Sequence, residues 1–285
     1  MRLIIHGVSS WIGYYLVSAL SKTRPSTEVV GLYRNTIPIL KTKIKCLSSK
    51  NFDDVKRFTD DFRPTAIINL ARGEDEEAFA LHQYFINFSN TNDGYYSFAS
   101  SANAVDANYL NFHDEEELPN AQTDYGKYKA KCEMELRESS KRFSILRFSA
   151  VHGWSPYGER RTETFLRELK DKGQVVATVG VFQNQIAVTD LGEMIACVLL
   201  RQGQGTFHLG PVDYLEHIDF LRKLAIGFGY NSTQIIDGEK KPFNLVVTPR
   251  RITAFDGSFK KSVLDTVRSV IGTPEFEIYK LKIED

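Results

Sequence analysis

Short apolar runs alternate with helical patterns over the first half of the chain, and this alternation most limits the folds it can adopt. After the first run, Ile12, Leu16 and Leu20 lie four residues apart and mark one face of a helix. Strands that are separated by helices pair in parallel and bury both faces of their sheet. The pattern therefore predicts an α/β fold with a doubly wound parallel sheet. The expected strands are 3–5, 28–33, 66–70, 95–100 and 144–148, and the expected later helices are 52–62, 78–90 and 124–142.

The local composition of the sequence changes after Val151, where tryptophan, proline, glycine and charged residues follow one another in HGWSPYGERR. We therefore expect a parallel-sheet domain over 1–153 and a smaller C-terminal lobe over 154–285. A strand and a helix near 183–210 are expected to return to the first domain. The acidic run at 114–117 is expected to be a solvated loop. Later helices are expected at 162–172 and 190–201, and later strands at 175–181, 185–188, 206–209 and 243–247.

Composition excludes several classes of function. Basic and acidic residues both number 36, so the net charge is zero and nothing favours a nucleic-acid partner. The N-terminus enters an apolar strand without a signal-peptide pattern, and no apolar run approaches the ~20 residues of a membrane span. Cys46, Cys132 and Cys197 lack metal-ligand or CxxC spacing. We expect a cytoplasmic protein with reduced thiols, no metal site and no membrane contact.

A glycine-containing loop, GVSSWIG at 7–13, joins the first strand to the first helix. A dinucleotide pyrophosphate requires a tight turn here, a close backbone approach and a helix N-terminus that points at it. Gly7 and Gly13 fit the first and last glycines of a GxxGxxG pattern, and Ser10 replaces the middle one. The sequence therefore predicts that NAD(P) binds at this loop. The candidate contacts are Gly7, Ser9, Ser10, Trp11, Ile12 and Gly13.

Arg34 follows the second strand, where the choice between NAD and NADP is made. An acidic residue at this position would bind the ribose hydroxyls of NAD. An arginine instead suits the 2′-phosphate of NADP, because its planar fork pairs with phosphate oxygens. The alternative interpretation of Arg34 is a solvated side chain at the start of a loop. We expect NADP(H) to be favoured over NAD(H).

A tyrosine and a lysine four residues apart, Tyr125 and Lys129, begin the long helix at 124–142. Residues at this spacing share one helix face. A nearby ammonium is expected to lower the pKa of the phenol from its usual ~10, so that the phenol exchanges a proton with a carbonyl or alcohol oxygen. Ser101 lies at the carboxyl end of the strand at 95–100, where doubly wound sheets bind ligands. The three residues together predict a site for carbonyl or alcohol chemistry.

The chain resembles the extended short-chain dehydrogenase/reductase superfamily. The resemblance rests on HGVSSWIG, AIINLAR, FASSANAV, DYGKYKAKCE and ILRFSAVHG, which occur in this order over residues 1–210. It implies a Rossmann-type domain, a catalytic triad of Ser101, Tyr125 and Lys129, and contact between Lys129 and the nicotinamide ribose. It also implies that the C-terminal lobe binds substrate. The further cofactor contacts implied by the resemblance are Leu70, Ala71, Arg72, Ser100, Phe148, Ser149 and Val151.

Within this superfamily, the chain is most similar to the dTDP-4-dehydrorhamnose reductase branch, on FRPTAIINLA, SSANAVDA and NQIAVTDLGEMIACVL. The resemblance implies reduction of a 4-keto nucleotide sugar, with a homodimer allowed. The branch usually has YVFDG where this chain has Asn103–Ala107. Arginines suit the substrate diphosphate, and His152 replaces a tyrosine of the VYG element. The candidate substrate contacts are Asn103, His152, Arg160 and Arg161.

Other functions remain open alongside the reductase. A 4,6-dehydratase normally carries an acidic pair after the catalytic hydroxyl residue, and Ala102-Asn103 occupy that place here. Dehydration is therefore disfavoured. A nucleotide-sugar epimerase of the same superfamily is the first alternative. A non-catalytic subunit that binds the cofactor is the second, although retention of Ser101, Tyr125 and Lys129 argues against a dead site.

Overall fold

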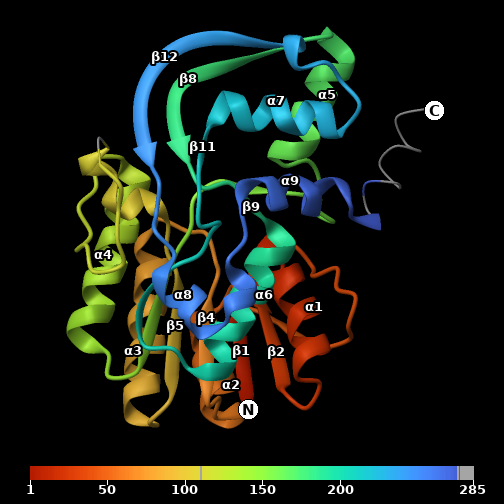
Figure 1. Ribbon diagram of the computed structural model, residues 1–285. Coiled ribbons are helices and arrows are strands. Elements are labelled where there is room, and N and C mark those ends of the chain that lie inside the picture. Colours follow the sequence, from red (N-terminus) through yellow and green to blue (C-terminus); the bar gives the residue numbers. More distant parts are fainter. Residues whose placement is uncertain (110, 275, 277–285) are drawn as a thin grey trace. The chain divides into compact units, whose positions relative to one another are not determined.

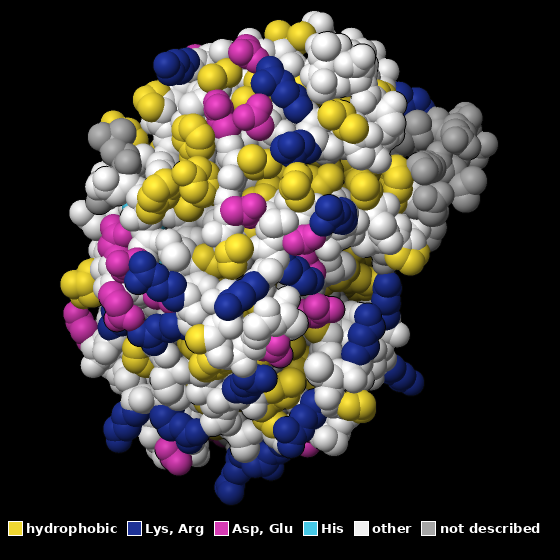
Figure 2. Space-filling view, viewed as in Figure 1, with side chains coloured by type: hydrophobic (Ala, Val, Ile, Leu, Met, Phe, Trp, Pro, Cys, Tyr) yellow, Lys and Arg dark blue, Asp and Glu magenta, His cyan; other side chains and the backbone are white. Residues whose placement is uncertain are grey.

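The computed structural model describes residues 1–109, 111–274 and 276, and the chain divides into two compact units. The first unit comprises Met1–Ala107, Glu116–Arg147 and Leu191–Phe207. The second unit comprises the described residues of Asn108–Glu115, Phe148–Asp190 and His208–Asp285. Figure 2 shows both basic and acidic side chains on one face, with Lys and Arg predominating along its lower edge. Among the described residues, no helix has the length and apolarity needed to cross a membrane.

A seven-stranded sheet with the order β10-β6-β5-β4-β1-β2-β3 forms the centre of the first unit (Figure 1). The pairs from β6 through β5, β4, β1 and β2 to β3 are all parallel. This order confirms the predicted Rossmann-type doubly wound sheet, because the chain turns back across β1 to build the second half. The strands are β1 (Arg2–His6), β2 (Glu28–Tyr33), β3 (Lys45–Ser48), β4 (Ala66–Asn69), β5 (Tyr95–Ala99), β6 (Phe143–Arg147) and β10 (Gly205–His208).

Helices cover both faces of this sheet, and their apolar residues form its core. Val55 of α2, Phe85 of α3 and Leu136 of α4 pack in one cluster with Ile4 and Ile67 of the strands. The helices α1 and α6 lie on the other face (Figure 1), and they approach closely where Gly192 meets Tyr15. The helices are α1 (Trp11–Thr23), α2 (Phe52–Phe62), α3 (Glu76–Thr91), α4 (Asp124–Ser139) and α6 (Val188–Arg201), with a 3-10 helix at Ala102–Asn108.

Capping side chains fix where several of these helices begin. Ser10 accepts a hydrogen bond from the Gly13 N–H, which is one of the helix donors that lack a partner within the helix. Asp75 caps α3 and Thr123 caps α4 in the same way. Since α1 and α4 carry predicted functional residues, their caps fix the residue at which each helix begins, and hence the helical turn in which those residues lie.

The second unit contains two small sheets, with orders β11-β8-β12 and β7-β9. The strands β8 and β12 run side by side in parallel along a curved path (Figure 1). Phe165, Phe220 and Leu224 belong to the apolar core of this unit. The elements are β7 (Val151–His152), α5 (Arg161–Lys172), β8 (Val175–Gln183), β9 (Ile186–Ala187), β11 (Leu215–Glu216), α7 (His217–Gly227), β12 (Ile235–Leu245), α8 (Arg250–Phe255) and α9 (Val263–Ile271), with 3-10 helices at Ser232–Gln234 and Gly257–Phe259.

Three features differ from the sequence expectations. β3 was not expected, because four residues at a sheet edge give too short a pattern to detect. β12 begins at Ile235 rather than at residue 243, because its first half is exposed and charged and is held by backbone pairing with β8. The acidic run is not wholly solvated, because Glu115 is buried. Its carboxylate accepts hydrogen bonds from the His208 N–H at 3.0 Å and the Arg251 N–H at 3.0 Å.

Candidate active site

The glycine loop brings three segments of the first unit into close contact. Gly7 has φ +83°, and a Cβ at this position would lie 2.6 Å from the Ala71 nitrogen. A Cβ on Gly13 would lie 2.6 Å from the Val8 carbonyl oxygen. Real side chains do not tolerate such distances, so both positions require glycine. The loop therefore has the tight turn and close approach that a dinucleotide pyrophosphate needs.

Ser10 fits the loop without the conformational freedom of a glycine. Its φ of −78° is ordinary for any residue, and its hydroxyl accepts from the Gly13 N–H at 3.0 Å. The backbone N–H groups of Trp11 and Ile12 come next, in the first turn of α1. The N-terminus of a helix carries a partial positive charge that attracts phosphate. The predicted loop residues thus form a surface that fits a pyrophosphate.

The other predicted residues of the first unit follow the carboxyl ends of parallel strands, which share one edge of the sheet. Arg34 follows β2, Leu70–Arg72 follow β4, and Ser100 follows β5. Asn69 fixes the turn after β4, because its Oδ1 accepts from the Ala71 N–H at 3.0 Å and lies 3.0 Å from His6 Nδ1. Burial lowers the pKa of His6 to about 4, so this histidine is neutral and structural.

Ser101, Tyr125 and Lys129 come together at this edge. Lys129 Nζ lies 5.8 Å from the centroid of the Tyr125 ring, and the Ser101 side chain is close enough to Tyr125 to oppose the rise of its pKa. Lys129 is 5% exposed and donates from Nζ to the Ala99 carbonyl at 2.9 Å. Gly126 lets α4 approach, because a Cβ there would overlap the Asn103 carbonyl oxygen. A phenol, a hydroxyl and an amine thus lie near one another at the carboxyl end of β5.

The pKa values of this cluster differ from the expectation in one respect. Burial raises the pKa of Tyr125, and the hydrogen bond with Ser101 and the charge of Arg72 only partly oppose this. The prediction of a lowered tyrosine pKa through Lys129 is therefore wrong for this structure, since burial outweighs the cations. Burial also lowers the pKa of Lys129 from 10.5 to about 8. Tyr125 is thus protonated at neutral pH in this structure.

A buried aspartate that the sequence gave no reason to select, Asp106, organises the loop in front of α4. Its carboxylate accepts from the Gln122 N–H at 2.7 Å and from the Thr123 hydroxyl at 2.5 Å. It also accepts from Asn103 Nδ2 at 3.2 Å, and Asn103 Oδ1 accepts from the Ser101 hydroxyl at 3.2 Å. Asn103, a predicted substrate contact, therefore links Ser101 to Asp106 through the hydrogen bonds of its side chain.

A buried ion pair, Glu133 with Arg147, lies behind the strand-end serines. Both side chains are fully buried, and Arg147 Nη2 lies 2.6 Å from Glu133 Oε2. Ser100 donates its hydroxyl to the same carboxylate. Ser100 therefore supports the site through Glu133 in this structure. The sequence offered one signal, since a glutamate on the inner stripe of a helix needs a buried partner.

Two arginines lie near the predicted cofactor edge. Arg34 pairs with Asp75 and Glu77 of the α3 start, at 3.3 Å and 2.8 Å. Arg72 Cζ lies 5.6 Å from the centroid of the Tyr125 ring, and its Nε lies 3.6 Å from Glu74. The acidic partners were not selected from the sequence. The only signal for Asp75 was its place before a helix, where a capping residue is expected.

The remaining predicted residues belong to the second unit. Phe148, Ser149 and Val151 lie in its segment Phe148–Asp190, and the Ser149 hydroxyl donates to the Asn184 carbonyl. His152, Arg160 and Arg161 line a single cavity of about 460 Å³. Its other lining residues come from α5, the start of β8 and the start of α7, and include Thr164, Glu168, Thr178 and His217.

This cavity contains two neutral histidines beside its two arginines. His152 is 1% exposed and packs on Phe220, with ring centroids 4.5 Å apart. Within the described part of the chain, neither ring nitrogen of His152 has a hydrogen-bond partner. Burial lowers the pKa of His152 far below 6.5 and that of His217 to about 4. The cavity thus offers positive charge, neutral ring nitrogens and apolar walls, which suit a phosphorylated organic ligand.

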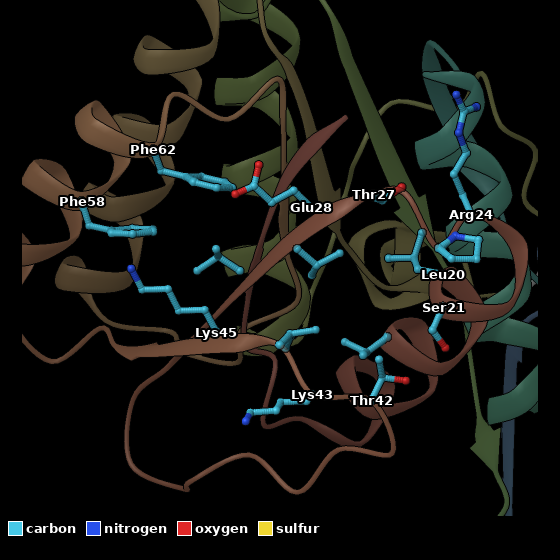
Figure 3. A pocket seen from close by; sticks show the side chains of 15 residues that line it. Leu20, Ser21, Arg24, Thr27, Glu28, Thr42, Lys43, Lys45, Phe58 and Phe62 are labelled. Atoms are coloured by element: carbon cyan, nitrogen blue, oxygen red, sulfur yellow. The ribbon is translucent and has the colours of Figure 1, made fainter.

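Another cavity, of about 480 Å³, lies in the first unit beside the starts of β2 and β3. Figure 3 shows Phe58 and Phe62 of α2 pointing into it, while the charged ends of Arg24, Lys43 and Lys45 point in different directions. These cations do not converge on one anion. The cavity lies at the amino ends of the strands, the edge opposite the candidate site. Among the described residues, no group of His, Cys, Asp or Glu is arranged to hold a metal ion.

No protein-family model matches the sequence, and no curated protein matches it. Solved structures match its fold over nearly the whole chain. A dTDP-4-dehydrorhamnose reductase from Bacillus anthracis in complex with NADP is 17% identical, with a TM-score of 0.76, covering 95% of this chain and 99% of that chain. A dTDP-glucose 4,6-dehydratase from the same organism in complex with NAD is 12% identical, with a TM-score of 0.79, covering 97% and 98%.

A UDP-N-acetylglucosamine 4-epimerase from Bacillus cereus is 17% identical, with a TM-score of 0.76, covering 95% of this chain and 98% of that chain. These proteins are a reductase, a dehydratase and an epimerase with one fold. At these identities the likeness shows that the chain shares the fold of these enzymes. Because unrelated chemistries share this fold, the choice among reactions depends on the residues of the site.

Proposed function

We propose that the protein is an NAD(P)H-dependent reductase of a nucleotide-linked 4-keto sugar. The observation that carries the proposal is the meeting of Ser101, Tyr125 and Lys129 at the sheet edge that also holds the Gly7 loop. Reduction of a ketone needs a hydride, a proton and a means of orienting the carbonyl group. The loop fits the cofactor that would supply the hydride, and the three side chains fit the other tasks.

The roles of the side chains follow from their chemistry. A reduced dinucleotide that is bound with its pyrophosphate at the Gly7 loop would supply the hydride to the carbonyl carbon. Tyr125 donates its phenolic proton to the carbonyl oxygen as that oxygen gains negative charge. The Ser101 hydroxyl donates to Asn103 Oδ1 in the structure, and on substrate binding it would turn to donate to the carbonyl oxygen and orient it. Lys129 holds the nicotinamide ribose with its ammonium group.

The cavity of the second unit supports a nucleotide-linked substrate. A diphosphate carries charge that Arg160 and Arg161 can pair with bidentately, and His152 offers a buried ring nitrogen without a protein partner. We therefore propose that these residues hold the nucleotide portion. Arg161→Ala is expected to raise KM for the nucleotide sugar about tenfold while the Kd for NADPH stays unchanged. An unchanged KM would contradict the proposal that the nucleotide binds in this cavity.

NADP(H) is the proposed cofactor, because Arg34 follows β2 where a 2′-phosphate would lie. Arg34→Ala should weaken the binding of NADPH more than the binding of NADH. Equal weakening of the two would exclude this assignment. We also propose a cytoplasmic location, since Cys46, Cys132 and Cys197 form no disulfide in the part of the chain that the structure describes, which suits a reducing compartment.

An epimerase is the second candidate, because the Bacillus cereus epimerase shares the fold. The test that separates the two reactions is incubation with NADPH and dTDP-4-dehydrorhamnose, the substrate in the name of the Bacillus anthracis reductase. Absorbance of the reduced nicotinamide should fall with the wild type and stay constant with Tyr125→Phe, although both bind NADPH. An isomerised sugar formed without consumption of NADPH would instead establish the epimerase. Loss of NADPH binding in a folded Tyr125→Phe variant would contradict the role given to Tyr125.

A further inference from the structure

We infer that Asp75 and Glu77, at the start of α3, compete with the cofactor for Arg34 and thereby restrict the preference for NADP(H). This inference rests on the proposed dinucleotide site. The sequence alone presents Arg34 as a cation for the 2′-phosphate. The structure adds two carboxylates to it, and they come from a segment about forty residues further along the chain.

Each of the two carboxylates accepts a hydrogen bond from a different nitrogen of the Arg34 guanidinium. Arg34 Nη1 donates to Asp75 Oδ2 at 3.3 Å, and Nη2 donates to Glu77 Oε2 at 2.8 Å. The guanidinium fork is thus shared between two carboxylates, which occupy the nitrogens that a phosphate would use. The Arg34 side chain is 49% exposed, so a ligand in solution can reach it.

Two costs follow when a 2′-phosphate binds to Arg34. The phosphate must displace at least one carboxylate from the guanidinium, and it then lies next to one or two negative charges. The ribose hydroxyls of NAD(H) carry no charge, so they need not displace a carboxylate and are not repelled by the acidic pair. The acidic pair therefore weakens NADP(H) selectively, and it leaves Arg34 with less discrimination than an isolated arginine would have.

The two acids differ in what else they do, which makes the inference testable. Asp75 caps α3 by accepting from the Ala78 N–H at 2.8 Å. Its replacement by alanine would disturb the helix, whereas asparagine keeps the cap and removes the charge. Glu77 is 81% exposed, so Glu77→Gln removes a charge with little effect on folding. Glu76 lies in the same first turn, is exposed and has no ion pair with Arg34 among the described contacts, so Glu76→Gln is the matched control.

The experiment is a fluorescence titration of the full chain with NADPH and with NADH, in low and physiological salt. Glu77→Gln should lower the Kd for NADPH about three- to tenfold, the range expected for one nearby charge, and leave the Kd for NADH within twofold. The gain should shrink as salt rises, because salt screens the repulsion. Asp75→Asn should act in the same direction, and Glu76→Gln should have less than half the effect on log Kd.

The effect should also depend on Arg34. In an Arg34→Ala background, Glu77→Gln should improve NADPH binding less than it does in the wild type, because the competition for the guanidinium is gone. An unchanged Kd for NADPH in Glu77→Gln, or an equal gain in Glu76→Gln, would overturn the inference. If Arg34→Ala still weakens NADPH in that case, the proposed cofactor site stands. Failure of the wild type to bind either dinucleotide would instead overturn the proposed function itself.

Discussion

Lys129→Met should make the protein more stable at neutral pH while abolishing its activity, and the stability difference should depend on pH in a defined way. The Lys129 ammonium is buried, and its pKa falls from 10.5 to about 8 on folding. At about 1.4 kcal/mol per tenfold change, this depression costs about 3 kcal/mol at pH 7. Loss of the hydrogen bond to the Ala99 carbonyl offsets about 1–3 kcal/mol of that gain.

The pH dependence is a cleaner test than the absolute difference. Between pH 8 and 10.5 the unfolded lysine binds more protons than the folded one, so the wild type gains stability as pH rises. Methionine has no such dependence. The free energy of unfolding of Lys129→Met minus that of the wild type should therefore fall by about 2 kcal/mol from pH 7 to pH 9.5.

Urea denaturation at the two pH values measures this difference, with Lys127→Met as control. Lys127 lies on the same helix with its side chain 62% exposed, so its replacement should shift stability equally at both pH values. A pH-independent difference for Lys129→Met would refute the claim that burial destabilises the ammonium. Activity at pH 7 should be lost in Lys129→Met and retained in Lys127→Met.

Two further variants test the supports of the site. Glu133→Ala should destabilise the protein by about 3–5 kcal/mol in urea denaturation, because it leaves the fully buried Arg147 guanidinium without its ion-pair partner. A loss of stability below about 1 kcal/mol would show that the ion pair is dispensable. Gly13→Ala should weaken dinucleotide binding at least tenfold in a fluorescence titration, because its Cβ would lie 2.6 Å from the Val8 carbonyl oxygen and must displace the loop. Wild-type affinity in Gly13→Ala would show that the loop does not contact the cofactor.

Strong local signals made part of the fold predictable. The helix at Phe52–Phe62 has the bounds that its sequence predicts, because Asn51 caps its start and Arg63, in a left-handed conformation before a proline, ends it. The four-residue spacing of Tyr125 and Lys129 likewise predicted their shared face. In these cases the deciding interactions lie within a few residues along the chain.

Interactions between distant segments were not predictable in the same way. The ion pairs of Arg34 with Asp75 and Glu77 join residues about forty positions apart, and nothing in either segment indicates the other. The raised pKa of Tyr125 depends on burial, which outweighs the nearby cations and reverses the expected direction. The partner of Glu115 is also remote, since its carboxylate accepts from the Arg251 backbone. Spacing along the sequence identifies functional groups, but their electrostatics depend on what packs around them.

Transfer of deuterium from NADPH that carries deuterium at both positions of the nicotinamide C4 tests the central claim most directly. The protein would be incubated with the labelled cofactor and a 4-keto nucleotide sugar, and the product sugar analysed by mass spectrometry and NMR. A reductase should incorporate one deuterium at the former carbonyl carbon for each NADPH oxidised, and Tyr125→Phe should incorporate none. An isomerised sugar without the label, with NADPH unconsumed, would contradict the assignment of a reductase.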